Sequence, residues 1–227
     1  MQQAKYAQKV KTLTATAMFC ALAYVCTALI KIPVQFLTLD LKDSLIILCS
    51  LLFGPISGLS VAVMVPLFEF ATISETGVYG LIMNILSSVT FAAVTGLIYK
   101  THKSMQGAVI GLISGVFAVT AVMVLANLFI TPYYLGTTTA VVAAMLPKIL
   151  LPFNLVKATL NAAIVLLLYK PLSKILKQIG FIRASSRPIA DDPTAKRRDV
   201  LRTAIVTSVA VVIITASLVV IFLVLRK

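Results

Sequence analysis

Seven apolar segments, separated by short basic or polar stretches, constrain the fold of this chain more than any other feature. They are residues 12–30, 44–53, 56–70, 78–99, 107–130, 152–169 and 200–225. Most of them approach the ~20 residues that a helix needs to cross the hydrocarbon core of a bilayer. Hydrophobic residues make up 60% of the 227 residues, more than a soluble core of this length could bury. The sequence therefore predicts an all-α integral membrane protein.

The charge of the chain indicates its orientation in the membrane. The formal net charge is +13, and the basic residues gather in short runs beside apolar segments. Such runs are typical of the cytoplasmic ends of membrane helices, and they do not favour nucleic-acid binding. Because Lys5, Lys9 and Lys11 precede the first span, we expect a multi-pass protein of the cell membrane with a cytoplasmic N-terminus.

The apolar pattern divides the chain into three parts. Residues 1–179 are predicted to form a six-helix membrane domain. Its segment 44–53 is only about half as long as a straight span and ends at Gly54, which favours a hairpin or two short, tilted helices. Residues 180–199 have the composition of a basic cytoplasmic linker. Residues 200–227 are predicted to form one additional transmembrane helix, which we interpret as a plain anchor.

The last span of the membrane domain carries a polar stripe. Asn154, Lys157 and Asn161 are spaced i, i+3 and i+7, so they share one face of a helix. An ammonium in the hydrocarbon region costs about 2.5–3.5 kcal/mol and normally faces a cavity or a partner. We therefore expect a ligand to meet all three side chains.

Further polar groups lie near the same, outer side of the membrane. Asp43 is interpreted as the cap of the following helix, which leaves Asp40 as the candidate for function. Glu69 either contributes to a site or reaches the lipid headgroups, and both alternatives stay open. Asn84 is a further candidate, although amides in such spans are commonly contacts between helices. With Asn127, these groups predict an outward-facing pocket for a partly aromatic or amphipathic small molecule.

Motifs of catalysis are absent from the sequence. It contains no G-x-x-x-x-G-K-[ST], H-E-x-x-H or G-x-S-x-G pattern. The three cysteines show no metal-ligand spacing, and His102 lies in a solvated loop. We therefore expect no catalytic residues, no metal and no cofactor. The sequence favours a small-molecule binder that draws its energy from partner proteins.

Four short motifs occur in order along residues 10–178. They are Phe36-Leu37-Thr38-Leu39-Asp40, Phe53-Gly54-Pro55 with Gly58, Ala126-Asn127-Leu128-Phe129 with Pro132, and Pro152-Phe153-Asn154-Leu155-Val156-Lys157. Together they resemble the substrate-binding S components of energy-coupling factor (ECF) vitamin transporters, and among these the riboflavin-specific members.

The resemblance implies a six-helix bundle that captures a vitamin from outside. It also implies docking on a transmembrane coupling subunit that two ATPase subunits drive. Small residues spaced AxxxA on the first helix contact that subunit in the family, and Ala17 and Ala21 fit this spacing. Riboflavin is the implied transported ligand, and the positions that match flavin-contacting residues are Asp40, Asn127, Asn154 and Lys157.

Two features depart from the family pattern. Glu69 stands where the riboflavin members carry basic and amide residues, so a different vitamin or flavin analogue is the alternative ligand. The seventh apolar segment is an addition to the six-helix pattern. From a different class of function, a structural membrane protein whose buried amides only hold helices together is the remaining alternative.

Overall fold

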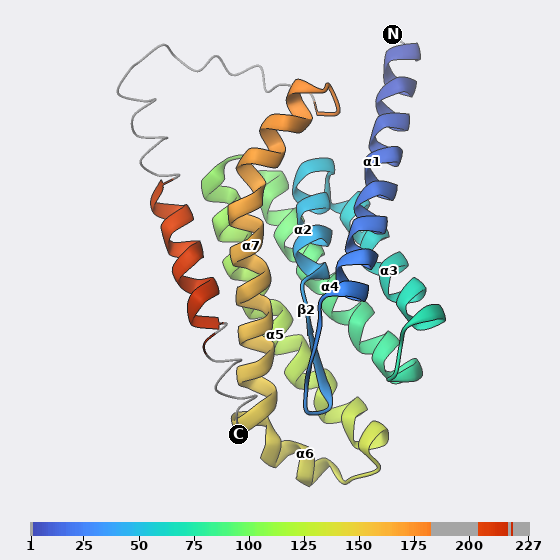
Figure 1. Ribbon diagram of the computed structural model, residues 1–227, viewed down its shortest axis with the longest axis vertical. Coiled ribbons are helices and arrows are strands. Elements are labelled where there is room, and N and C mark those ends of the chain that lie inside the picture. The colour runs from blue at the N-terminus through green and yellow to red at the C-terminus, as the bar shows by residue number, and fades with distance from the viewer. Residues whose placement is uncertain (1, 183–203, 218, 220–227) are drawn as a thin grey trace.

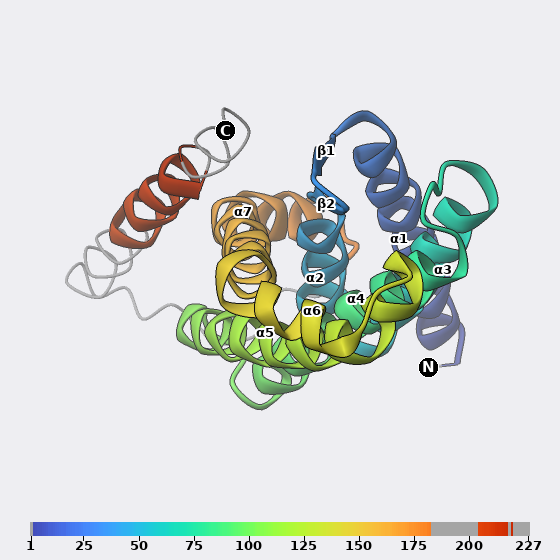
Figure 2. The ribbon, with the colours of Figure 1, turned by 90° about the horizontal axis from the view of Figure 1, so that it is seen from below.

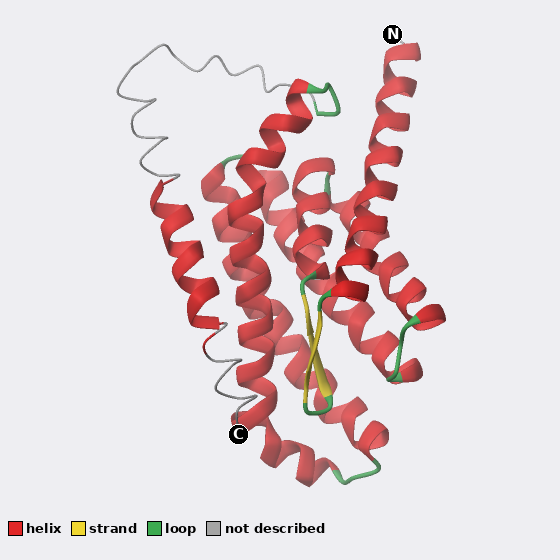
Figure 3. Ribbon diagram, viewed as in Figure 1, coloured by secondary structure: helices red, strands yellow, loops and turns green. Residues whose placement is uncertain are grey.

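The computed structural model describes residues 2–182, 204–217 and 219 of the chain (Figure 1). Helices dominate these residues, and one small hairpin of two strands accompanies them (Figure 3). The elements are α1 (Gln2–Leu29), β1 (Lys31–Val34), β2 (Leu37–Asp40), α2 (Lys42–Phe53), α3 (Pro55–Thr72), α4 (Gly77–Thr101), α5 (Met105–Leu135), α6 (Thr139–Met145), η1 (Leu146–Leu150) and α7 (Leu151–Gln178), followed by the helix Ala204–Ser217.

Five helical segments in the described part are long and apolar enough to cross a membrane. They are Tyr6–Leu29 of α1, then α3, α4 and α5, and the continuous segment Thr139–Gln178 that ends in α7. This agrees with the prediction of a helical membrane bundle. Within the described residues the predicted count of six spans plus one is not reproduced, because α2 has 12 residues and the described part of the last segment, Ala204–Ser217, is shorter than a span. Most of the predicted linker, residues 183–199, lies outside the described residues.

The short helix α2 is the central element of the bundle. Viewed from below, it lies in the middle, with α1 and α3 on one side and α7 on the other (Figure 2). Gly54 has a φ of 100°, a conformation that L side chains rarely adopt, and it ends α2. Pro55 then occupies the first position of α3, where its missing N–H costs nothing. The prediction of two helices broken at Gly54 is therefore confirmed.

Small residues allow α2 to pack closely against its neighbours. A Cβ atom on Gly58 of α3 would lie 2.3 Å from the Cβ atom of Ser50, and one on Gly96 of α4 would lie 2.1 Å from Ser50 Oγ. The Ser50 hydroxyl donates a hydrogen bond of 2.9 Å to the Ala92 carbonyl, so its polar atom is satisfied inside the core. These contacts hold the C-terminal half of α2 against α3 and α4 in the core of the bundle.

The structure corrects the predicted all-α fold at residues 31–40. They form an antiparallel hairpin in which Lys31 pairs with Asp40 and Val34 with Leu37. Its turn is made possible by Gln35, which has a φ of 56°. The side chains of Val34 and Leu39 are buried. The hairpin lies with α6 at the end of the bundle opposite the N-terminus (Figure 1).

Candidate functional site

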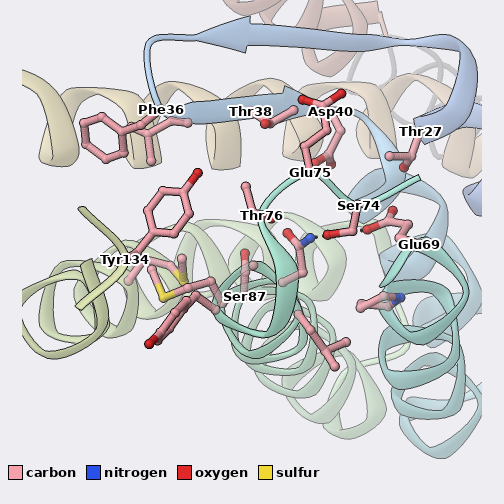
Figure 4. Close-up of a pocket in the computed structure, with 18 of the residues that line it drawn as sticks. Thr27, Phe36, Thr38, Asp40, Glu69, Ser74, Glu75, Thr76, Ser87 and Tyr134 are labelled. Atoms are coloured by element: carbon pink, nitrogen blue, oxygen red, sulfur yellow. Dashed lines mark hydrogen bonds between the residues drawn. The ribbon is translucent and has the colours of Figure 1, made fainter. Parts of the chain in front are cut away.

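A cavity opens at the end of the bundle opposite the N-terminus, between the hairpin, the α3–α4 loop and helices α4, α5 and α7 (Figure 4). Its lining combines aromatic and aliphatic side chains with a cluster of polar groups. All six side chains that the sequence marked as substrate-binding candidates line it, namely Asp40, Glu69, Asn84, Asn127, Asn154 and Lys157. The structure thus brings these residues together from five elements of the chain, while their contact with a ligand stays a prediction.

An ion pair joins the end of the hairpin to α7. Lys157 Nζ lies 2.8 Å from Asp40 Oδ2 and 3.3 Å from the carbonyl oxygen of Thr38. Burial of Asp40 opposes its ionisation, but the ammonium groups of Lys157 and Lys42 outweigh this effect and hold the pKa of the carboxyl below its ordinary value. Asp40 is therefore an ionised acceptor in the wall of the cavity.

A second ion pair, which the sequence analysis missed, lies beside the first. Lys42, the first residue of α2, is 1% exposed, and its Nζ atom lies 2.6 Å from Glu69 Oε2 and 3.7 Å from Asp40 Oδ2. Asn84 Nδ2 donates a longer bond of 3.3 Å to the same oxygen of Glu69. Glu69 is only 5% exposed, so the alternative that it reaches the lipid headgroups is wrong. The signal that could have identified Lys42 is its position between two aspartates at the start of an apolar helix.

Two carboxylate oxygens of this cluster accept no hydrogen bond from the residues that the structure describes. Asp40 Oδ1 and Glu69 Oε1 are buried and have no hydrogen-bond partner within the described part of the chain. An ionised carboxylate oxygen can only accept hydrogen bonds. The cluster therefore offers two acceptors in a cavity wall whose own donors are already used on the other oxygens.

Two amides of the site, those of Asn127 and Asn154, are held by their own helical segments. Asn127 Nδ2 donates to the Met123 carbonyl at 2.6 Å, and its Oδ1 accepts from the Thr131 hydroxyl at 2.8 Å. Asn154 Nδ2 donates to the carbonyl of Leu150 at 2.8 Å, where η1 meets α7. These bonds fix the position of each amide without tying it to another helix.

Asn161, the third residue of the polar stripe, does not belong to the cavity. It is fully buried; its Oδ1 accepts from the Ser44 N–H at 2.8 Å, and its Nδ2 donates to the Asp40 carbonyl at 3.1 Å. The expectation that a ligand meets it together with Asn154 and Lys157 is wrong, because the first turn of α2 occupies that part of the α7 face. Asn161 instead fixes the start of α2 and the end of β2 on α7.

Asp43 also has a different role from the predicted helix cap. The N-cap of α2 is Leu41, and it makes no side-chain capping bond. Asp43 lies in the first turn, is 2% exposed and accepts a hydrogen bond from the Ser88 hydroxyl of α4. It therefore links α2 to α4 below the cavity.

Ala17 and Ala21 lie away from the cavity, on α1. Both are exposed, whereas Ala15, Phe19 and Ala23 on the opposite face of this helix are buried. The small residues therefore lie on an outer face of the bundle. Among the described residues, no group of His, Cys, Asp and Glu side chains is arranged to hold a metal ion.

The chain is similar to known membrane transport proteins. Residues 11–169 match the family model described as ECF transporter, substrate-specific component. The riboflavin transporter RibU of Staphylococcus aureus (strain TCH60) is 30% identical over 182 residues, which are 76% of this chain and 95% of that protein. The riboflavin transporter FmnP of Bacillus subtilis (strain 168) is 27% identical over 188 residues, 75% of this chain and 96% of that protein.

A solved structure supports the same relationship. It is the S component of a bacterial ECF transporter, with a TM-score of 0.64 and 29% sequence identity over 74% of this chain and 99% of the solved chain. The family match ends at residue 169, before the helix Ala204–Ser217. The fold, the extent of the match and the identity to these relatives agree, and the chain therefore belongs to the family of substrate-specific components of ECF transporters.

Proposed function

We propose that this S component binds riboflavin, captures it from outside the cell and delivers it through an ECF coupling module. The observation that carries the proposal is the convergence of Asp40, Asn127, Asn154 and Lys157 on one cavity. These residues come from the motifs that resemble the riboflavin-specific members, and two relatives bear the name riboflavin transporter.

The chemistry of the cavity suits a flavin. The edge of an isoalloxazine ring carries carbonyl acceptors and an N–H donor, which the amides of Asn127 and Asn154 can pair. The ribityl chain carries hydroxyl groups, which Asp40 and Lys157 can pair. A ligand that left such buried groups unpaired would lose about 1–3 kcal/mol for each, which gives the site a physical basis for selectivity.

Glu69 favours the alternative of another vitamin or a flavin analogue, because it departs from the riboflavin-specific pattern. Its charge is not isolated, however. Lys42 Nζ lies 2.6 Å from Glu69 Oε2, and both side chains are buried. A buried, paired carboxylate does not require a cationic ligand, so the site remains suited to a neutral vitamin such as riboflavin.

The membrane orientation and the partners belong to the same proposal. With a cytoplasmic N-terminus, the cavity at the opposite end of the bundle faces the outside of the cell membrane. The exposed face of α1 with Ala17 and Ala21 then contacts the transmembrane coupling subunit, and two ATPase subunits supply the energy. The lipid bilayer covers the remaining apolar surface, and nucleic acid is not a partner.

The structural alternative, in which the polar groups only hold helices together, makes a different prediction. Asn154 bonds to its own helix, and Lys157 faces the cavity. The double variant Asn154→Ala, Lys157→Ala should therefore lose ligand binding and still give a folded, though less stable, protein in detergent, since it also loses the ion pair with Asp40. An unfolded product would favour the structural role.

The first experiment tests riboflavin directly. The chain is purified in detergent, its visible absorption spectrum is recorded, and protein stripped of ligand is titrated with riboflavin while the flavin fluorescence is followed. We expect a yellow protein that quenches flavin fluorescence at nanomolar concentrations. A colourless protein that is indifferent to flavins would overturn riboflavin as the ligand, and a thermal-shift screen of other vitamins would then test the alternative.

A further inference from the structure

The two carboxylates of the site use only one oxygen each for contacts within the protein. Asp40 Oδ2 lies 2.8 Å from Lys157 Nζ and 3.7 Å from Lys42 Nζ. Glu69 Oε2 lies 2.6 Å from Lys42 Nζ and 3.3 Å from Asn84 Nδ2. The second oxygens, Asp40 Oδ1 and Glu69 Oε1, are buried without a partner in the described part of the chain. The donors of the cluster thus gather on one side of each carboxylate.

Both carboxylates belong to the cavity wall. Figure 4 shows Asp40 and Glu69 projecting from β2 and α3 toward the same space, with the hydroxyl-bearing side chains of Ser74 and Thr76 nearby. Glu69 is 5% exposed, so bulk water does not satisfy its second oxygen. A ligand group that meets these two oxygens must donate hydrogen bonds, because ionised carboxylate oxygens only accept them.

A phosphate group does not meet this requirement. At neutral pH a phosphate monoester is mostly a dianion that accepts hydrogen bonds and donates almost none. Near Asp40 and Glu69 it would meet two carboxylates whose neighbouring ammonium groups, on Lys42 and Lys157, are already engaged. Lys31 at the rim is also engaged, since its Nζ lies 4.0 Å from Glu75 and donates to the Ile73 carbonyl. Like charges in a dry site strongly disfavour binding.

We propose that Asp40 and Glu69 form a subsite for the hydroxyl groups of the ligand, and that Glu69 makes the site reject phosphorylated forms of that ligand. Lys42 acts as a positioning residue, because it holds Glu69 Oε2 and leaves Oε1 for the ligand. The inference rests on the proposed function, since it assigns the ribityl chain of riboflavin to this end of the cavity. It gives a physical role to Glu69, which the resemblance marks as a departure from the riboflavin-specific pattern.

Three flavins separate the parts of this proposal. Riboflavin carries the free ribityl chain, FMN carries the same chain with a terminal phosphate, and lumiflavin carries the ring without the chain. Dissociation constants are measured by fluorescence quenching for the wild-type protein and for Glu69→Gln, which keeps the size of the side chain and removes its charge. We expect wild-type protein to bind riboflavin about 100-fold more tightly than FMN. In FMN the phosphate replaces a hydroxyl that could donate to a carboxylate, and its negative charge is repelled by Asp40 and Glu69.

In Glu69→Gln the ratio of riboflavin to FMN affinity should fall by about 10-fold or more. FMN no longer meets the Glu69 carboxylate, while riboflavin loses a charged acceptor for its hydroxyl groups. Lumiflavin affinity should stay within about twofold, since the ring does not use this subsite. The matched control is Glu75→Gln, which removes a carboxylate whose side chain is 88% exposed at the rim. This control should leave the ratio of riboflavin to FMN affinity unchanged.

Because Glu69→Gln removes the nearer of the two carboxylates beside the Lys42 ammonium, the double variant Lys42→Met, Glu69→Gln is measured in parallel, with the same expected loss of discrimination. An unchanged ratio in these variants would overturn the proposal, and so would wild-type protein that binds FMN as tightly as riboflavin. Failure of the wild-type protein to bind riboflavin or lumiflavin would instead show that the proposed function is wrong. Where a variant does not fold, wild-type protein that binds FMN as tightly as riboflavin still overturns the proposal.

Discussion

Lys157 Nζ and Asp40 Oδ2 lie 2.8 Å apart, although 117 positions of the chain separate the two residues. The bond joins β2 of the hairpin to α7, and both elements line the cavity. Both side chains line the cavity, so the same ion pair contributes to the fold and is available to a ligand. These two contributions can be separated by substitution.

The variant Lys157→Met should lose both the stability and the ligand affinity that the ion pair provides. Removing one partner of a buried ion pair leaves an uncompensated charge and costs about 3–5 kcal/mol of stability. Here the loss should fall at the lower end of that range, because Lys42 remains 3.7 Å from Asp40 Oδ2. Thermal unfolding in detergent measures the stability, and flavin fluorescence quenching should show riboflavin affinity reduced by about 100-fold.

The matched control is Asp40→Asn combined with Lys157→Met. It removes both charges, and replacing a complete buried pair is often close to neutral for stability. We expect its melting temperature to recover toward the wild-type value while riboflavin binding stays weak. If binding recovered together with stability, the ion pair would act only on the fold.

A second prediction contrasts two asparagines on α7. Asn161 bridges the Ser44 N–H and the Asp40 carbonyl, whereas Asn154 bonds only to Leu150 of the preceding turn. Asn161→Ala should therefore cost about 2–4 kcal/mol of stability, from two lost long-range bonds between buried groups. Asn154→Ala should change stability by about 1 kcal/mol or less and weaken riboflavin binding by about 10-fold or more.

Thermal unfolding and riboflavin titration of both variants give the two quantities. Titrations are performed well below each melting temperature, so that loss of folded protein does not imitate loss of affinity. The opposite pattern, with Asn154 dominating stability and Asn161 dominating affinity, would contradict the assignment of Asn154 to the cavity wall and Asn161 to the core.

The difference between these asparagines also shows what the sequence could and could not predict. Helical spacing placed Asn154, Lys157 and Asn161 on one face, and the structure agrees. Spacing along one helix says nothing about which neighbour covers that face at each level. The first turn of α2 covers Asn161, and only the tertiary contact with Ser44 reveals this.

The burial of Lys42 could not be predicted from the sequence either. A lysine between two aspartates, just before an apolar segment, has the composition of a solvated loop as well as of a helix start. In the structure it is 1% exposed because α2 lies in the middle of the bundle, and its charge is met by Glu69 of α3. The hairpin of residues 31–40 was missed for a related reason, since its short strands are stabilised by burial of Val34 and Leu39 at the end of the bundle. The helices, by contrast, follow from apolar segments that the sequence shows directly.

A third prediction tests the packing of the central helix. A Cβ atom on Gly58 would lie 2.3 Å from the Cβ and 2.7 Å from the Cα of Ser50, so Gly58→Ala forces the backbones of α2 and α3 apart. We expect a loss of about 1–3 kcal/mol of stability, the usual effect of overpacking a core. Thermal unfolding measures it, with Ile56→Ala as the control on the same helix, because the Ile56 side chain is 81% exposed. Equal melting temperatures for Gly58→Ala and the control would show that the contact between α2 and α3 is looser than described.

The last prediction concerns the outer face of α1 and depends on the proposed coupling subunit. Ala17 and Ala21 are exposed on one face of this helix, so larger side chains there meet no part of the bundle. Ala17→Trp and Ala21→Trp should therefore leave riboflavin affinity and melting temperature close to the wild-type values. They should reduce uptake of labelled riboflavin by about 10-fold or more in cells that contain the coupling module, because close helix approach requires small residues at the contact.

The control is Leu97→Trp, which enlarges a 56% exposed side chain on α4. Uptake that survives both alanine substitutions would place the coupling contact on another face, whereas equal loss in the control would indicate a general effect of bulky residues at the lipid surface.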